Sequence, residues 1–307
     1  MEVTVIVCTH NPRKDYLERV MQGLKGQSLE RGRWELLVVD NASKEPVSEG
    51  LVLGWHPGGR CVREERLGLT EARLRGIRES RGELLIFVDD DNVLQEDYLE
   101  VAVRLSAEWP LLGVFGGGAE GEFERQPGES VLRYLHHLAL RKVERPRWSN
   151  LPDSGAAEPW GAGMCLRRPV AEAYLNYCRE RRQYMTDRRG QLLNSGGDNE
   201  ICRVALQEGW GMGVFPQLFF IHLIPAFRVE EDYLVRLVEG MEFSCVLIGH
   251  RFHGTNPYND WTVGGILRFL RNWLRSSGLE RRMCVARFRG RERARRELAG
   301  WGDKEGR

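Results

Sequence analysis

Short apolar runs that end in polar residues recur along the N-terminal third of the chain. The runs cover residues 3–8, 34–39 and 84–88. Each is mostly apolar, which predicts a strand buried on both faces, as in a parallel sheet. In chain order the runs end in Thr9-His10-Asn11, Asp40-Asn41-Ala42-Ser43 and Asp89-Asp90-Asp91-Asn92. These polar ends would meet at the carboxyl edge of the sheet, where α/β proteins bind their ligands.

Helical periodicity lies between and after these runs. Apolar residues at helical spacing (Leu17, Val20, Met21 and Leu24) predict an amphipathic helix that joins the first two strands, with Asp15 as its N-cap. Residues 95–109 show the same spacing directly after the acidic residues. Alternation of strands and helices predicts βαβ units and therefore an α/β fold. Residues 116–118, three glycines, predict a strand end at which the backbone passes close to a neighbour, within a loop-rich stretch at 110–130.

The C-terminal third changes to a helical pattern. A first helix is predicted after Pro225, and a second from 262 to 276 has a long apolar face: Val263, Ile266, Leu267, Leu270, Trp273 and Leu274. Arginines lie off that face, and eight more follow between residues 281 and 296. Such a helix either lies on an anionic membrane surface or packs its apolar face on the rest of the protein. No nucleic-acid motif accompanies the arginines, so we expect no nucleic-acid partner.

Composition narrows the class of protein. The 307 residues are 42% hydrophobic with a net charge of +1, which suits one large domain, with or without an appendage. Seven scattered cysteines without a Cys-x-x-Cys pair argue against a disulfide framework or a zinc site. The sequence shows no signal peptide and no apolar window of about 18 residues. We expect a cytoplasmic enzyme, with peripheral contact to the inner face of an anionic membrane through residues 262–296.

The residues after the third run carry the strongest chemical signal. Three adjacent carboxylates repel one another and cost desolvation, unless a divalent cation with a phosphate on its other side neutralises them. The alternative is a solvated acidic turn.

The ordered set of motifs resembles family-2 glycosyltransferases with the GT-A fold. The resemblance covers about the first 225 residues and rests on Thr9 to Asn11, Asp40 to Ser43, Leu67 to Arg73, Asp89 to Asp91, Trp160 to Arg168 and Gly197 to Glu200. It implies a Rossmann-like α/β fold, with a mostly parallel central sheet flanked by helices and a C-terminal helical appendage. The implied catalytic domain is 1–225, with a nucleotide-sugar half at about 1–115 and an acceptor half at 116–225. Residues 226–307 form the arginine-rich appendage.

The resemblance also assigns a metal site that holds Mn²⁺ or Mg²⁺. Asp91 is expected to bind the metal directly, Asp89 to lie near the ribose or reach the metal through water, and Asp90 to point away from the metal toward the structure. The alternative register uses Asp90 and Asn92. His222, which emerges from an apolar run, is either a further metal ligand or a core histidine.

Nucleotide recognition is expected from the other strand ends. Thr9 and Asn11 would line the base and ribose, and Asp40 would accept a hydrogen bond from the imide N–H of uracil or thymine. The alternative for Asp40 is an Asx turn with Ser43. Arg73 would reach the base or the diphosphate, or lie solvated on the surface.

On the acceptor side the resemblance implies Asp198 as the catalytic base. The acidic residue that commonly precedes the base is Gly197 here, so Glu200 competes for the assignment, and an N-cap is the alternative role for Asp198. Trp160 would stack on a sugar or pack in the core, and Gly163 would allow close backbone approach. Residues 145–160 and 179–197 resemble segments that close over the donor.

The expected function is metal-dependent, inverting transfer of a sugar from a nucleoside diphosphate sugar, with uridine diphosphate favoured. The acceptor would be a hydroxyl of a glycan, a lipid-linked glycan or a small molecule, in polysaccharide biosynthesis. Two alternatives remain: a catalytically inactive GT-A protein that binds sugar or acts as a scaffold, and a nucleotidyltransferase. The second needs a Gly-rich phosphate loop after the first strand, which residues 9–14 do not supply.

Overall fold

The computed structural model describes residues 1–152, 154–181, 184–188, 190, 192–254 and 262–305. The chain forms two compact units. The first comprises Met1–Glu122, Ala139–Thr186 and Gly197–Ile224, and the second Phe123–Leu138, Asp187–Gly196 and Pro225–Arg307. The second unit thus takes two segments that the sequence analysis placed in the catalytic domain, and the boundary at residue 225 stays a prediction.

A single sheet forms the centre of the first unit. Its strands follow the order β3-β2-β1-β4-β8-β6-β9-β5, and β7 pairs with β9. The bounds are β1 Val3–Thr9, β2 Trp34–Asn41, β3 Gly59–Glu64, β4 Leu84–Asp89, β5 Asn92–Leu94, β6 Leu112–Phe123, β7 Arg147–Ser149, β8 Cys165–Arg167 and β9 Gly211–Ile224.

The two halves of this sheet differ in strand direction. Strands β3, β2, β1 and β4 run parallel, whereas the pairs β4–β8, β6–β8, β5–β9 and β7–β9 are antiparallel. In the parallel part Thr9 lies opposite Asp40, and Cys8 lies opposite Asp89. The carboxyl ends of three strands therefore meet at one edge, as the sequence predicts.

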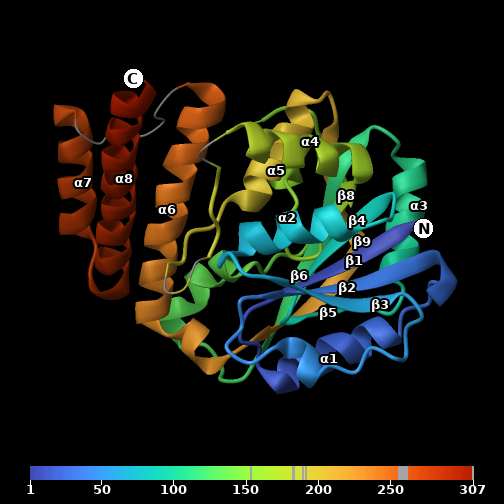
Figure 1. The fold of residues 1–307 in the computed structure, drawn as a ribbon. Helices are drawn as coiled ribbons and strands as arrows, with labels where there is room; N and C mark the ends of the chain where they lie inside the picture. Colours follow the sequence, from blue (N-terminus) through green and yellow to red (C-terminus); the bar gives the residue numbers. More distant parts are fainter. Residues whose placement is uncertain (153, 182–183, 189, 191, 255–261, 306–307) are drawn as a thin grey trace. The chain divides into compact units, whose positions relative to one another are not determined.

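Helices cover both faces of the sheet (Figure 1). Their bounds are α1 Lys14–Lys25, α2 Leu69–Glu79, α3 Tyr98–Glu108, α4 Arg168–Glu180 and α5 Gly197–Gln207. The predicted apolar face of α1 is buried. The predicted N-cap is wrong: α1 begins at Lys14, and Asp15 in its first turn forms an ion pair with Arg13 at 2.6 Å. The Asp15 carboxylate therefore bonds to Arg13 instead of capping the helix.

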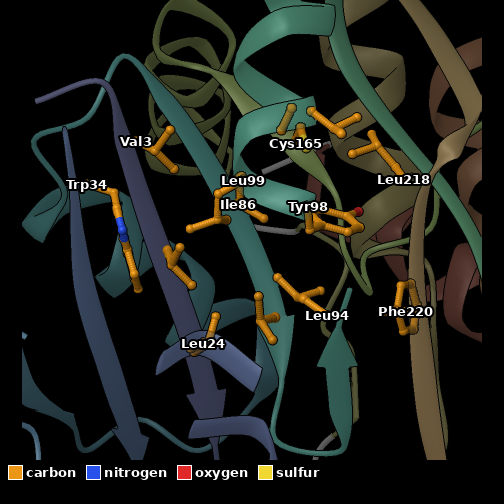
Figure 2. Close-up of a cluster of buried hydrophobic side chains, with 14 of the residues drawn as sticks. Val3, Leu24, Trp34, Ile86, Leu94, Tyr98, Leu99, Cys165, Leu218 and Phe220 are labelled. Carbon is orange, nitrogen blue, oxygen red and sulfur yellow. The ribbon is translucent and has the colours of Figure 1, made fainter. Parts of the chain in front are cut away.

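One hydrophobic core includes residues from both the parallel and the antiparallel part of the sheet (Figure 2). Val3 and Ile86 from the parallel strands and Phe220 from β9 contribute to it, together with Trp34 and Tyr98. The stretch around Gly117 is the interior of β6 rather than a strand end or a loop. A Cβ atom on Gly117 would overlap the backbone carbonyl of Leu218. The predicted close backbone approach is confirmed, and the predicted strand end is wrong.

The second unit is helical. Its main helices are α6 Glu231–His253, α7 Val263–Arg275 and α8 Gly278–Glu305, and the 3-10 segments η3 Glu129–Leu138 and η5 Ala226–Val229 belong to it. Helix α8 lies between α6 and α7 (Figure 1). Helix α6 is the first helix predicted after Pro225, and its apolar residues Leu234, Leu237 and Val238 are buried. Within the described residues, no helix has the length and apolarity needed to cross a bilayer.

Candidate active site

The ends of β1 and β4 are joined by a side-chain hydrogen bond. The hydroxyl of Thr9 donates to Asp90 Oδ2 at 2.5 Å. Asp90 therefore has a partner within the chain at the end of β1, and the expectation that it lies away from the metal stays a prediction. The physical reason for the contact is the register of β1 and β4, which places Cys8 beside Asp89 and so brings the following residues together.

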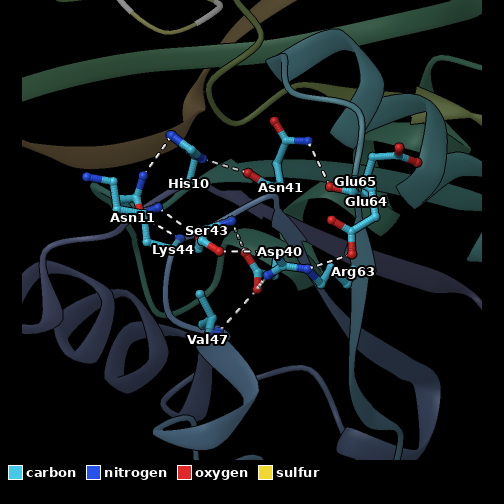
Figure 3. A network of polar contacts seen from close by, with 10 residues as sticks. All are labelled: His10, Asn11, Asp40, Asn41, Ser43, Lys44, Val47, Arg63, Glu64 and Glu65. Atoms are coloured by element: carbon cyan, nitrogen blue, oxygen red, sulfur yellow. Dashed lines mark hydrogen bonds and ion pairs between the residues drawn. The ribbon is translucent and has the colours of Figure 1, made fainter.

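The ends of β1 and β2 are joined by a second network (Figure 3). The Asn11 N–H donates to Ser43 Oγ, and the Lys44 N–H donates to Asn11 Oδ1, each at 2.9 Å. Asn11 adopts φ +48°, a left-handed conformation that asparagine tolerates better than most residues. The network fixes the turn that was expected to line the base and ribose, and that contact stays a prediction.

Asp40 forms the Asx turn that was the alternative to a base contact. Its carboxylate is buried and accepts from the Ser43 N–H at 3.1 Å, the Val47 N–H at 3.2 Å and Arg63 Nη1 at 2.8 Å. Burial alone raises the pKa of Asp40, but these hydrogen bonds and the arginine charge outweigh it, so the pKa lies below its usual range. Contact with the imide of a base stays a prediction.

Asn41 is a residue whose role the sequence analysis missed. Its buried side chain accepts from the Gly68 N–H at 2.8 Å and donates to the Arg66 carbonyl at 2.8 Å. These bonds order the loop that leads into α2, the helix that carries Arg73. An amide directly after Asp40 at a strand end was the available signal.

Arg73 is buried, so the solvated-surface alternative is wrong. Its residue exposure is 4%, its guanidinium lies 5.3 Å from the Phe87 ring, and Nη2 lies 3.7 Å from Asp89 Oδ1. Asp89 itself keeps about a third of its side chain exposed. The arrangement places a fixed positive charge behind an accessible carboxylate at the end of β4.

Asp91 and His222 are brought together by strand pairing. Asn92 lies opposite His222 in the β5–β9 pair, and the Leu223 N–H donates to the Asp91 carbonyl at 2.8 Å. Asp91 Oδ2 then lies 3.5 Å from His222 Nε2, and both residues are buried. The Asn92 amide donates to Asp91 Oδ1 at 2.9 Å, which fixes the carboxylate.

This pair has the spacing of two ligands on one cation. Neighbouring ligands on a six-coordinate Mg²⁺ or similar ion lie about 3 Å apart, so a small adjustment from 3.5 Å would admit the ion. Within the part of the chain that the structure describes, no group of three His, Cys, Asp or Glu side chains is arranged to hold a metal. The remaining ligands would have to come from phosphate oxygens and water.

Asp198 lies in the first turn of α5. That helix begins at Gly197, so Asp198 is inside it, and the N-cap alternative is wrong. Its carboxylate accepts from the Gly161 N–H and from the Asn199 N–H, each at 2.9 Å. A Cβ atom on Gly161 would lie 2.8 Å from Arg73 Cζ. Gly161 therefore connects the expected base with Arg73 and, through it, with Asp89.

Glu200 does not contact the acceptor side as expected. It is wholly buried and accepts from the Met185 N–H at 3.0 Å and from the hydroxyls of Tyr174 and Tyr177 at 3.3 and 3.4 Å. A carboxylate enclosed in this way cannot reach a sugar hydroxyl. We correct the assignment: Glu200 anchors the segment before α5.

The glycines and tryptophan of the acceptor segment have structural partners. Gly163, at φ +71°, donates its N–H to the Phe87 carbonyl at 3.0 Å, and a Cβ there would lie 2.6 Å from the Tyr98 hydroxyl. Its close approach is thus to the core rather than to a ligand. Trp160 is half-buried, with the guanidinium of Arg141 centred 4.1 Å from its ring.

Glu158 is a second acidic residue of this region that sequence reasoning missed. It accepts from the Asn199 amide at 2.8 Å and lies 3.7 Å from Arg203. Burial raises the pKa of Glu158. Nothing in its sequence context, a loop before a proline, distinguishes it. Through Asn199 it braces the turn that carries Asp198. The predicted closure of residues 145–160 and 179–197 stays a prediction, and 153, 182–183, 189 and 191 lie outside the described residues.

The family model described as Glycosyl transferase family 2 matches residues 4–174, more than half of the chain. The protein belongs to this family. It is also similar to the Bacillus subtilis (strain 168) protein named "Putative glycosyltransferase EpsH", with 24% identity over 164 residues, which cover 48% of this chain and 46% of that protein. The match therefore spans less than half the length of that relative.

Solved structures share the fold. S. aureus TarS 1-349 is 15% identical, with a TM-score of 0.55 over 97% of this chain and 92% of that one. Its complex with UDP-GlcNAc is 14% identical, with the same TM-score and coverage. A longer TarS chain gives a TM-score of 0.54 at 14% identity over 86% of this chain and 45% of that one. The expected fold class, an α/β GT-A sheet with flanking and C-terminal helices, is confirmed.

Proposed function

We propose that the protein is an inverting glycosyltransferase that moves a sugar from a nucleoside diphosphate sugar to a hydroxyl acceptor. The observation that carries the proposal is that Asp89, Asp91 and His222 meet at the strand ends, with Asp198 linked to Asp89 through Gly161 and Arg73. Uridine diphosphate is the favoured carrier, because the TarS fold has been solved with UDP-GlcNAc and with UDP.

A divalent cation, Mn²⁺ or Mg²⁺, fits the donor side. Asp91 and His222 would hold it, and Asp89 would lie close by toward the ribose or a metal-bound water. When bound, the cation supplies a Lewis acid that neutralises charge on the departing diphosphate. The guanidinium of Arg73 lies 3.7 Å from Asp89, so its charge acts on that carboxylate.

The acceptor side supplies the base. Asp198 takes the proton from the acceptor hydroxyl, while the Gly161 and Asn199 N–H groups hold its carboxylate in place. A single base and direct displacement give inversion at the anomeric carbon. The proposed acceptor is a hydroxyl of a glycan, a lipid-linked glycan or a small molecule in polysaccharide biosynthesis. We also propose a cytoplasmic location, because the seven scattered cysteines include no Cys-x-x-Cys pair.

Gly197 supports one alternative function. Gly197 stands where relatives commonly carry an acid, so a sugar-binding protein without transfer activity is the second candidate. We would incubate the protein with a panel of nucleotide sugars and Mn²⁺ and measure nucleoside diphosphate release, with Asp198→Asn as the matched control. Release that depends on Asp198 supports transfer, whereas tight donor binding without any release by the wild-type protein supports the second candidate.

A further inference from the structure

Helix α7 turns its apolar face away from α8, the helix on which it packs within the second unit. Five of its large apolar residues are between 38% and 77% exposed: Val263, Ile266, Leu267, Leu270 and Leu274. The helix packs on α8 through its other side, where Phe269 stacks on Phe288 with 4.5 Å between ring centroids and Gly265 is buried. Within the second unit, no described residue covers this face, whereas a packed amphipathic helix buries its apolar residues.

Positive charge flanks the exposed face. Arg268, Arg271 and Arg275 follow helical spacing beside it, all are exposed, and none forms an ion pair with any residue that the structure describes. By contrast, arginines of α8 pair with acids of α6, as Arg282 does with Glu231. Residues 262–296 contain eleven arginines and two glutamates, in a chain whose net charge is only +1. Arg268, Arg271 and Arg275 therefore leave unneutralised positive charge on α7.

A pocket of about 230 Å³ opens between α7 and α8, on the side of α7 opposite the apolar face. Three arginines line it (Arg268, Arg287 and Arg291), together with Asn272, Ser276 and the acidic Glu280. Arg287 and Arg291 also approach Glu242, at 3.7 and 2.9 Å, so they are held in place rather than free to turn outward. The pocket therefore lies away from the face that α7 would turn to a membrane, and the membrane inference rests on that face and on Arg268, Arg271 and Arg275.

We propose that α7 lies in the surface of a membrane that contains anionic phospholipid, with its apolar face at the acyl boundary and its arginines at the phosphates. Thirteen residues of helix measure about 20 Å, too short to span a bilayer but suited to lying in its plane. A second copy of the chain fits the face less well, because two such helices would bring their arginine rows together. The inference is independent of the proposed transfer reaction.

The test is cosedimentation of the full-length protein with vesicles. Vesicles of phosphatidylglycerol and phosphatidylcholine should bind it, and vesicles of phosphatidylcholine alone should bind it far less. Binding should weaken as salt shortens the Debye length from about 30 Å at 0.01 M to about 8 Å at 0.15 M. Each substitution of Arg268, Arg271 or Arg275 by Gln should lower the partition coefficient about fivefold.

Replacing three exposed leucines, Leu267→Ser, Leu270→Ser and Leu274→Ser, should lower binding by roughly 100-fold or more and leave the melting temperature unchanged. Leu111→Ser is the matched control, since Leu111 is 79% exposed and lies outside α7. The proposal is overturned if the wild type does not sediment with anionic vesicles at low salt, or if both sets of variants bind as well as the wild type. A leucine variant that loses a dimer seen by light scattering, without any vesicle binding by the wild type, would identify a second copy as the occupant.

Discussion

The two carboxylates in the first turn of α5 offer a matched pair of substitutions. Asp198 is half-buried and accepts from the Gly161 and Asn199 N–H groups, whereas Glu200 is wholly buried. We expect Asp198→Asn to lower the rate of sugar transfer by about 10² to 10⁴, because an amide cannot take the proton. Donor affinity should stay near that of the wild type, since the metal and nucleotide ligands are unchanged.

For the free energy of unfolding we expect the reverse order: Glu200→Gln should lose more stability than Asp198→Asn. Asparagine keeps one acceptor oxygen at a site that water can reach, so Asp198→Asn should cost less than about 1 kcal/mol of unfolding free energy. In Glu200→Gln an amide NH₂ replaces one of the oxygens that accept from Met185, Tyr174 and Tyr177. A neutral amide oxygen accepts more weakly than a carboxylate, and the Tyr177 hydroxyl would have to turn to accept, which should cost about 1–3 kcal/mol at this buried site and lower the melting temperature by several degrees.

Three measurements on each variant decide the matter: nucleoside diphosphate release, donor affinity by calorimetry, and a melting curve. Glu200→Gln should transfer sugar within about threefold of the wild-type rate once the folded fraction is taken into account. An inactive but stable Glu200→Gln protein, beside an active Asp198→Asn protein, would refute the assignment of both residues.

Three further predictions concern other parts of the chain. Gly161→Ala should displace Arg73 and weaken donor binding, and unchanged affinity would contradict the contact. Gly117→Ala should lower the unfolding free energy, measured by chemical denaturation, by roughly 3 kcal/mol or more, because the added methyl overlaps a carbonyl of β9. Gly50→Ala, with open space around the added methyl, is the control, and an equal loss in both variants would count against the argument. Burial lowers the pKa of His137 to about 4, so the imidazole stays neutral in the fold while the unfolded chain takes up a proton. The unfolding free energy should therefore fall as the pH drops from about 6.5 to about 4. Urea unfolding of His137→Gln at several pH values should show a weaker pH dependence, and a dependence equal to that of the wild type would contradict the burial of a neutral His137.

The regular parts of the first unit could be predicted because their patterns are local. The apolar runs of β1, β2 and β4 identify buried parallel strands, and the spacing in α1 identifies its buried face. β6 was missed because glycines are typical of turns, whereas here Gly117 is required by the close approach of β9. That approach depends on a strand about a hundred residues later, which local patterns do not report.

The candidate site shows the same division. The order of motifs brought Asp91 and His222 into one hypothesis, and the pairing of β5 with β9 places them together. The sequence could not decide between Asp198 and Glu200, since both belong to one helical turn. Their different burial comes from Tyr174 and Met185, on segments that precede the helix. For α7, periodicity identified the apolar face but not whether anything covers it.

The central claim is that Asp91 holds a divalent cation that in turn holds the donor diphosphate. The most direct measurement is calorimetric titration of UDP with and without Mn²⁺, on the wild type, Asp91→Ala and the neighbouring control Asp90→Ala. We predict that Mn²⁺ tightens UDP binding by the wild type and by Asp90→Ala, and that Asp91→Ala loses this gain while remaining folded. An Asp91→Ala protein that binds UDP with the full Mn²⁺ dependence would contradict the account, and loss of the gain in Asp90→Ala alone would shift the metal site by one residue.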